Sequence, residues 1–127
     1  MRRLLLDTHA FLWWLAEDTK LSEEASEAIT DTTSLVHVSA VTVWEIAIKA
    51  NLGKIDLAGA DMEYEIAANG FVELPITARH ALRAGSLPRH HDDPFDRMLI
   101  AQAQLEDLII ITHDKAFLLY GISSLST

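Results

Sequence analysis

The chain has 127 residues, half of them hydrophobic, which suits one compact domain over residues 1–127 with its own core. Ten basic and nineteen acidic residues give a formal net charge of −9, which argues against broad, sequence-independent adhesion to nucleic acid. There is no cysteine, so a thiolate metal site is excluded and only oxygen and imidazole ligands remain. No apolar run approaches the length of a membrane span and the start does not resemble a signal peptide, so we expect a cytoplasmic protein.

Short apolar runs alternate with stretches of helical periodicity along the chain. The runs predict strands at 4–6, 36–39, 71–74 and 108–112, with a last strand near 122–123. Helices are predicted at 9–15, 23–29, 41–50, 61–69, 77–85 and from 94 to at least 103, with a short helical piece at 117–119. This alternation predicts an α/β fold with a parallel sheet, whose strands all end at the same edge.

One helix start carries the sharpest local signal. Asp93 followed by Pro94 indicates an N-cap and a first helical residue, because proline loses nothing where the amide has no intrahelical partner. Met98 and Leu99 follow at helical spacing, which leaves Asp96 in the first turn near the polar side of the helix. A carboxylate there complements the helix dipole, whereas binding of a metal requires other acids to converge on the same place.

Four acids are predicted to converge at the carboxyl edge of the sheet, where open α/β sheets bind ligands. Asp7 ends the first strand and Asp114 follows the fourth, while Glu45 and Asp96 stand in the first turns of helices that begin at this edge. Carboxylates brought so close repel one another unless a cation intervenes, and Mg²⁺ uses a few carboxylates together with substrate phosphate. Such a site activates water for displacement at phosphorus, so phosphodiester hydrolysis is the reaction class that follows.

Each of these acids also has a purely structural alternative. Asp7 and Asp114 are each placed to cap the helical segment that follows. Glu45 is placed to complete a capping box that begins three residues earlier, or to pair with Lys49 one turn later. Asp96 is placed to complement the dipole of its helix.

The histidines and tryptophans carry less weight than the acids. No pair of histidines has the spacing of a zinc site. Three are expected on helix or strand surfaces (His9, His37 and His80). Three flank the acids (His90, His91 and His113), where solvated loop positions are favoured over a role in substrate binding. The tryptophans are expected in the core or an interface (Trp13, Trp14 and Trp44). The loop at 85–92 is a candidate substrate-facing segment because it is basic in an acidic chain.

Four stretches, in a fixed order and spread over the whole chain, form a further pattern: LLDTH at 5–9, SAVTVWEI at 39–46, DPFDRMLIAQA at 93–103 and THD at 112–114. Together they resemble the PIN-domain nuclease family, most closely the VapC toxins of type II toxin-antitoxin pairs. The resemblance implies a three-layer α/β/α sandwich with a mostly parallel central sheet. It also implies an acidic pocket that holds Mg²⁺ or Mn²⁺ and cleaves RNA with water activated at the bound ion.

The resemblance assigns roles to particular residues. Asp7, Glu45, Asp96 and Asp114 fall on the acidic positions of the family pattern. Asp7 and Asp96 would be the principal metal ligands, and Glu45 would bind the metal or orient water. Asp114 would support a second ion or its water shell, and Thr112 falls where the family often has a hydroxyl residue beside the pocket.

The resemblance also implies partners. Family members are usually homodimers and are neutralised by a cognate antitoxin, whose carboxyl-terminal segment lies over the pocket and often contributes basic residues. Opposite charge would speed such an encounter, and Trp13-Trp14 would form part of an apolar groove for the segment. RNA would then be bound through the metal and a limited basic set: Lys49, Lys54, Arg79, Arg83, Arg89, Arg97 and Lys115.

Two other functions compete with this interpretation. A non-catalytic PIN-like interaction module would keep the acids as caps, bind only a partner and show no metal-dependent cleavage. Phosphoryl transfer on an aspartate, as in receiver or haloacid dehalogenase-like folds, is disfavoured for two reasons. Asp7-Thr8-His9 lacks a second acid two residues on, and no lysine closes a later apolar strand.

Overall fold

The computed structural model describes all residues from Met1 to Thr127. Its strands are β1 (Arg3–Leu6), β2 (Leu35–Ser39), β3 (Val72–Leu74), β4 (Ile109–Thr112) and β5 (Ser124–Ser126). They form one sheet in the order β3-β2-β1-β4-β5, in which every neighbouring pair is parallel. The predicted parallel sheet is confirmed, except that the last strand begins two residues later than expected.

The helices are α1 (Thr8–Leu15), α2 (Glu23–Thr30), α3 (Ala40–Asn51), α4 (Met62–Ala68), α5 (Ala78–Ser86) and α6 (Pro94–Glu106), with a 3₁₀ helix, η1 (Lys115–Tyr120). The predicted Asp93 cap forms, and the side chains of Ser22, Asp61 and Thr77 cap their helices in the same way, by accepting hydrogen bonds from first-turn amides. None of the helices combines the length and apolar character needed to cross a membrane.

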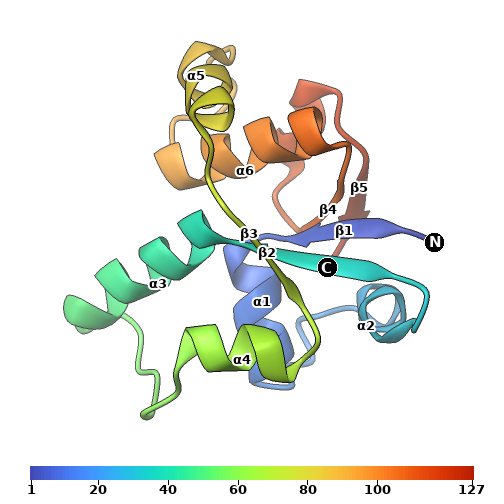
Figure 1. Ribbon diagram of the computed structural model, residues 1–127, viewed down its shortest axis with the longest axis vertical. Coiled ribbons are helices and arrows are strands. Elements are labelled where there is room, and N and C mark those ends of the chain that lie inside the picture. Colours follow the sequence, from blue (N-terminus) through green and yellow to red (C-terminus); the bar gives the residue numbers. More distant parts are fainter.

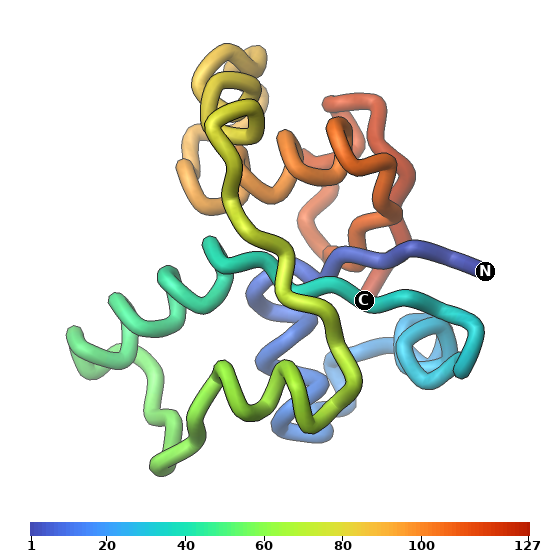
Figure 2. Tube along the Cα trace, in the orientation of Figure 1, coloured from blue at the N-terminus to red at the C-terminus, as the bar shows by residue number.

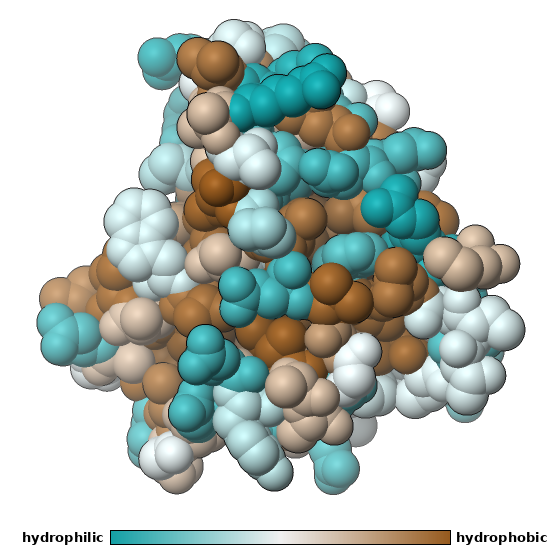
Figure 3. Space-filling model, in the orientation of Figure 1, coloured by the Kyte–Doolittle hydropathy of each residue, from teal (hydrophilic) through white to brown (hydrophobic).

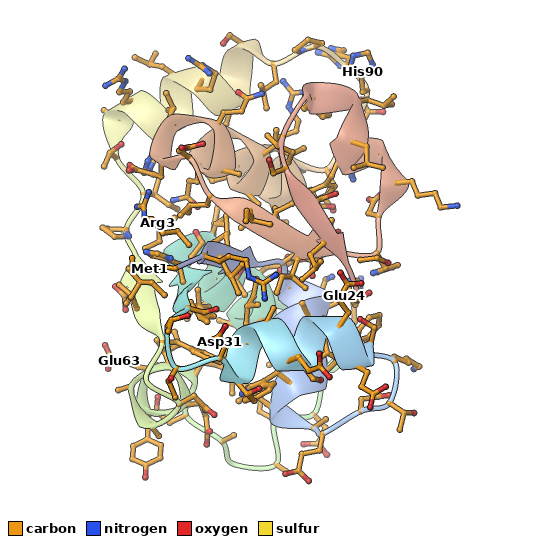
Figure 4. All side chains as sticks on the ribbon, turned by 90° about the vertical axis from the view of Figure 1, so that its right-hand side faces the viewer. Met1, Arg3, Glu24, Asp31, Glu63 and His90 are labelled. Carbon is orange, nitrogen blue, oxygen red and sulfur yellow. The ribbon has the colours of Figure 1, made fainter.

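The sheet separates two apolar cores. Leu4 and Leu6 of β1 and Ile111 of β4 pack with α1, α2 and α4 on one face. Leu5 and Ile110, which alternate with them, pack with α5, α6 and η1 on the other face, because successive strand residues point to opposite sides. Figures 1 and 4 show the resulting three layers, with the sheet between the two helical layers. The predicted α/β/α sandwich is therefore confirmed.

Parallel strands place all carboxyl ends on one side of the molecule, the side from which α3 projects in Figure 1. Figure 2 follows the chain from α4 through the edge strand β3 to α5, so that β3 carries it from one helical layer to the other. Figure 4 views the opposite side, where Met1 and Arg3 lie at the amino end of β1. The predicted site therefore lies on the side away from the chain start.

Two histidines expected on surfaces are buried instead. The Nδ1 of His37 in β2 donates to the carbonyl of Leu4, 2.9 Å away on the neighbouring strand. The Nδ1 of His80 accepts from the Thr77 amide at 3.1 Å, and its Nε2 lies 3.0 Å from Glu106 Oε1. The surface prediction was wrong because each ring finds a partner that spacing along the chain does not reveal.

Two leucines on adjacent helices test the α5–α6 layer. Leu99 in α6 is fully buried, whereas Leu82 in α5 is 77% exposed. We expect Leu99→Ala to lower the free energy of unfolding by about 2–5 kcal/mol, because it removes buried contacts and leaves a cavity. Leu82→Ala is the matched control and should change it by no more than about 0.5 kcal/mol. Urea unfolding followed by circular dichroism measures both, and equal effects would contradict the packing described.

Candidate metal centre

Asp7 is the most deeply buried of the four predicted acids, with 3% of its surface exposed at the end of β1. Its Oδ1 accepts from the amide of Ala10 at 2.8 Å, so the predicted cap of α1 is confirmed. Burial raises the pKa of Asp7, although hydrogen bonds from Ala10 and the Thr112 side chain act against the rise. Thr112 thus contacts the acid that the sequence placed beside it.

Glu45 is also buried, in the second turn of α3. Its Oε1 accepts from Thr8 Oγ1 at 2.6 Å, and its Oε2 pairs with Lys49 Nζ at 2.8 Å. The Lys49 pairing is confirmed, but the capping box is wrong, because α3 begins earlier and is capped by Ser39. The hydrogen bond to Glu45 raises the pKa of Lys49, and the charges of Glu45 and Asp96 add to this. Lys49 therefore serves the site and is not a free surface cation.

Asp96 lies at the centre of the negative charge. Asp93 caps α6 as predicted, with its Oδ1 accepting from the amides of Phe95 and Asp96 at 2.8 and 3.2 Å. Burial and the charges of Asp93, Glu45 and Asp7 raise the pKa of Asp96 to about 7, against an opposing contribution from the nearby His91. Asp7 and Glu45, both far from Asp96 in the sequence, thus lie within electrostatic reach of it.

Asp114 joins Asp96 through a histidine. The Nε2 of His91 lies 2.9 Å from Asp114 Oδ2 and 3.1 Å from Asp96 Oδ2. Asp114 also caps η1, as predicted, by accepting from the Ala116 amide at 2.9 Å. Burial acts to raise the pKa of Asp114, but the hydrogen bonds from Ala116 and His91 outweigh it, so this pKa lies below its ordinary value. His91 is half-buried, and its prediction as a solvated loop residue was wrong.

Arg97 explains why the loop after α5 reaches the site. Its guanidinium donates to four carbonyls, those of Ala84, Leu87, Pro88 and His91, at 2.9–3.1 Å. These contacts hold residues 84–91 against the start of α6, with His91 turned toward the acids. Arg97 was grouped with the RNA-binding side chains, but its donors are already used within the chain. The basic character of the loop was the only signal in the sequence that marked this segment.

The donor set suits a hard divalent cation. Asp7, Glu45, Asp93 and Asp96 supply carboxylates whose mutual repulsion raises the pKa of Asp96, and a cation among them would relieve it. His91, Asp96 and Asp114 each offer one atom that lies within 4.8 Å of the other two. The structure therefore brings the four predicted acids together, and it adds His91, which the sequence placed beside the acids but exposed to solvent.

A surface groove lies between α1, α2 and α4, and none of the four acids lines it. It has a volume of about 600 Å³, and Trp13, Trp14 and Leu21 supply apolar surface while Glu17 and Glu23 supply acidic side chains. The ring of Trp13 also contacts the rings of His9 and His113, at centroid distances of 5.6 and 5.2 Å. Because His9 and His113 affect the pKa of Asp7, this aromatic contact connects the groove to the acids.

Trp44 differs from the other two tryptophans because it is 60% exposed, so it does not belong to the core. Its ring packs edge-on against Phe95 at 5.3 Å, beside an apolar depression of about 300 Å³ between α3 and α6. Figure 3 shows apolar surface along α3, where Leu52 is also exposed. This face remains a candidate interface.

Comparison with known proteins identifies the fold family. Residues 4–122 match the PIN domain family. The chain belongs to the PIN-domain family. It is 33% identical to Ribonuclease VapC22 of Mycobacterium tuberculosis over 117 residues, covering 91% of this chain and 89% of that protein, which places it among the VapC-type members. The predicted family membership is confirmed.

Solved structures agree with this PIN fold. A structure of VapBC2 from Rickettsia felis, bound to a DNA fragment from its promoter, superposes with a TM-score of 0.73 at 11% identity and covers 98% of each chain. VapBC-1 from nontypeable Haemophilus influenzae gives 0.69 at 15% identity, covering 98% of this chain and 97% of the other. At these identities the likeness extends to the fold alone.

The raised pKa of Asp96 predicts a dependence of stability on pH in metal-free buffer. An acid whose pKa is higher in the folded state destabilises that state as it ionises, here between about pH 4 and pH 7. Asp96→Asn keeps an acceptor for His91 but removes the charge. We therefore expect the variant to be more stable than the parent by about 2–4 kcal/mol at pH 8, and the difference to shrink as pH falls toward 4. Urea unfolding with chelator present measures it, and a difference independent of pH would contradict the assignment.

Proposed function

We propose that this PIN-domain protein is a metal-dependent endoribonuclease that hydrolyses phosphodiester bonds in RNA, and that it is the toxin of a type II toxin-antitoxin pair. The observation that carries the proposal is the gathering of the acids at one edge of the sheet: Asp96 and Asp114 share the His91 N–H, and the charges of Asp93, Glu45 and Asp7 add to burial in raising the pKa of Asp96. The 33% identity to a protein named Ribonuclease VapC22 supports the same activity. The cofactor would be Mg²⁺ or Mn²⁺, and the protein would act in the cytoplasm, where RNA is present.

In this proposal each acid has a role that follows from its contacts. Asp7 and Asp96 would hold the ion, and the cap that Asp7 makes on α1 fixes its carboxylate in advance. A bound divalent ion would supply Lewis acidity toward water and the RNA phosphate. Glu45, held by Thr8 and Lys49, would orient water, since a carboxylate oxygen that accepts one hydrogen bond can accept another. Asp114 would support the site from η1.

Lys49 would meet the phosphate charge, because its ammonium group lies among the acids. With Lys49 and Arg97 engaged inside the chain, the remaining members of the basic set are exposed side chains: Lys54, Arg79, Arg83, Arg89 and Lys115. So few cations on an acidic protein would bind RNA weakly without an ion in the site.

Asparagine substitutions separate this nuclease from a non-catalytic module. The caps made by Asp7 and Asp114 are what the non-catalytic alternative requires of these residues. Asparagine also caps helices well, so Asp7→Asn removes charge while keeping the fold. Mutation of a residue that only hydrogen-bonds to a metal ligand typically lowers metal affinity or activity by about 10–100-fold. Because Asp7 and Asp96 would bind the ion directly, we expect Asp7→Asn and Asp96→Asn each to slow RNA cleavage by at least about 100-fold.

The assay follows cleavage of a labelled RNA with Mg²⁺ or Mn²⁺ and again with excess chelator, which should abolish it. Asp92→Asn, at an exposed neighbouring aspartate, is the control and should cut at the parent rate. Thermal unfolding shows whether the variants remain folded. Folded Asp7→Asn and Asp96→Asn proteins that cleave as fast as the parent would eliminate the assignment.

We further propose that the groove at Trp13-Trp14 receives a basic segment of the antitoxin. Its apolar surface suits hydrophobic side chains, and Glu17, Glu23 and Glu65 offer opposite charge to lysine or arginine. The contact of Trp13 with His9 and His113 would bring such a segment beside the metal centre. The homodimer expected from the resemblance stays a prediction, with the apolar face at Trp44 as its candidate interface.

Charge reversal in the groove tests this docking surface. Expression of the chain alone should arrest bacterial growth, and co-expression of the small gene beside its own should restore it. We expect the double variant Glu17→Lys with Glu23→Lys to escape this rescue, with association of the purified partner slowed about tenfold at low salt. Glu27→Lys, exposed on α2 but outside the groove, is the matched control. Full rescue of the double variant would show that the partner docks elsewhere.

A further inference from the structure

His91 is placed like a metal ligand, but its hydrogen bonds determine a different role. The backbone amide of Asp93 donates to its Nδ1 at 3.1 Å. A neutral imidazole that accepts at Nδ1 carries its proton on Nε2. This Nε2–H points at Asp114 Oδ2, 2.9 Å away, and at Asp96 Oδ2, 3.1 Å away. The ring is therefore a donor shared by two carboxylates.

The same contact opposes binding of a metal by His91. Ligation through Nε2 requires a free lone pair there, which moves the ring proton to Nδ1. That proton would face the Asp93 amide hydrogen at the 3.1 Å contact, and two donors would then oppose each other. Three potential ligand atoms within 4.8 Å thus comprise two carboxylate oxygens and one N–H group.

The loop that carries His91 is anchored firmly enough to keep this arrangement. Arg97 donates to four carbonyls between Ala84 and His91. The Tyr120 hydroxyl donates to Pro88 O at 2.7 Å and accepts from the amide of His90 at 3.0 Å. These contacts hold the loop backbone beside the acids, and the Asp93 amide orients the ring itself.

We propose that His91 takes the place of a second divalent ion between Asp96 and Asp114, and thereby restricts the site to one ion held by Asp7 and Asp96. A second ion beside the first would draw on Asp96 and Asp114, the two carboxylates that the His91 N–H joins. The His91 N–H lies between the two carboxylates, 3.1 Å from Asp96 Oδ2 and 2.9 Å from Asp114 Oδ2, so it fills the space that a second cation shared by these oxygens would need. This inference rests on the proposed function, because it concerns the ion that the nuclease would use.

Counting bound Mn²⁺ tests the inference without RNA. The full chain is titrated with Mn²⁺ alone, and free Mn²⁺ is followed by electron paramagnetic resonance. We expect the parent to saturate at one ion per chain and His91→Ala to saturate at two, because the variant frees both oxygens. His91→Gln should stay at one ion, since its amide N–H replaces the Nε2–H. His90→Ala, on the outer corner of the α5–α6 layer (Figure 4), is the matched control and should also stay at one.

The tautomer of His91 gives a second test that needs no variant. Nitrogen-15 spectra of the imidazole should show the proton on Nε2 in the metal-free chain and in the chain saturated with Mg²⁺. A proton on Nδ1 in the Mg²⁺ form would mean that His91 binds the ion, and this would overturn the inference. Saturation of the parent at two ions, or of folded His91→Ala at one, would overturn it as well.

The outcomes also separate the inference from the function on which it rests. If the parent binds one Mn²⁺ but does not cleave RNA, the proposed nuclease activity is wrong and the proposed role of His91 stands. If the parent binds two ions and cleaves RNA, the proposed nuclease activity stands and the proposed role of His91 is wrong. A parent that binds no ion would overturn both.

Discussion

Repulsion among carboxylates at one edge of the sheet is the constraint on which the rest of the structure depends. Burial and the charges of Asp93, Glu45 and Asp7 together raise the pKa of Asp96, and the parallel sheet with its two apolar cores holds these groups in place. The fold offsets part of this repulsion with its own groups. Lys49 pairs with Glu45 and lies within reach of the charges of Asp93 and Asp96. The His91 N–H is shared by Asp96 and Asp114, and helix amino ends face Asp7 and Asp96.

Most of the fold follows from local signals, because its central strands and helix starts are encoded by neighbouring residues. The apolar run that forms β4 and the Asp93-Pro94 cap of α6 need no knowledge of the rest of the chain. β5 was misplaced by two residues because its position depends on pairing with β4, and its sequence carries no apolar run. The burial of His37 likewise depends on a carbonyl of another strand.

The acids of the candidate site could be grouped from the sequence because topology alone brings strand ends together. The details that depend on remote side chains could not. Thr8 binds Glu45 across 37 positions of sequence, and no pattern marks the pair. His91 lies beside the acids because the Arg97 guanidinium binds four backbone carbonyls between residues 84 and 91. The spacing of residues along the sequence does not predict these contacts. The sequence therefore predicted the acids, their caps and the Lys49 pair, but not the contacts that Thr8 and His91 make with the acids.

In the proposed function, the same region of negative electrostatic potential would attract both the metal ion and the basic segment of the partner. The acids that attract a divalent ion also repel RNA, so the ion would be needed for the substrate to approach as well as for the chemistry. The groove adds Glu17 and Glu23 to this field and reaches the acids through Trp13 and His113. A basic segment seated there would neutralise the charge that the ion needs. The partner would then inhibit by competing electrostatically with the ion, in addition to covering the site.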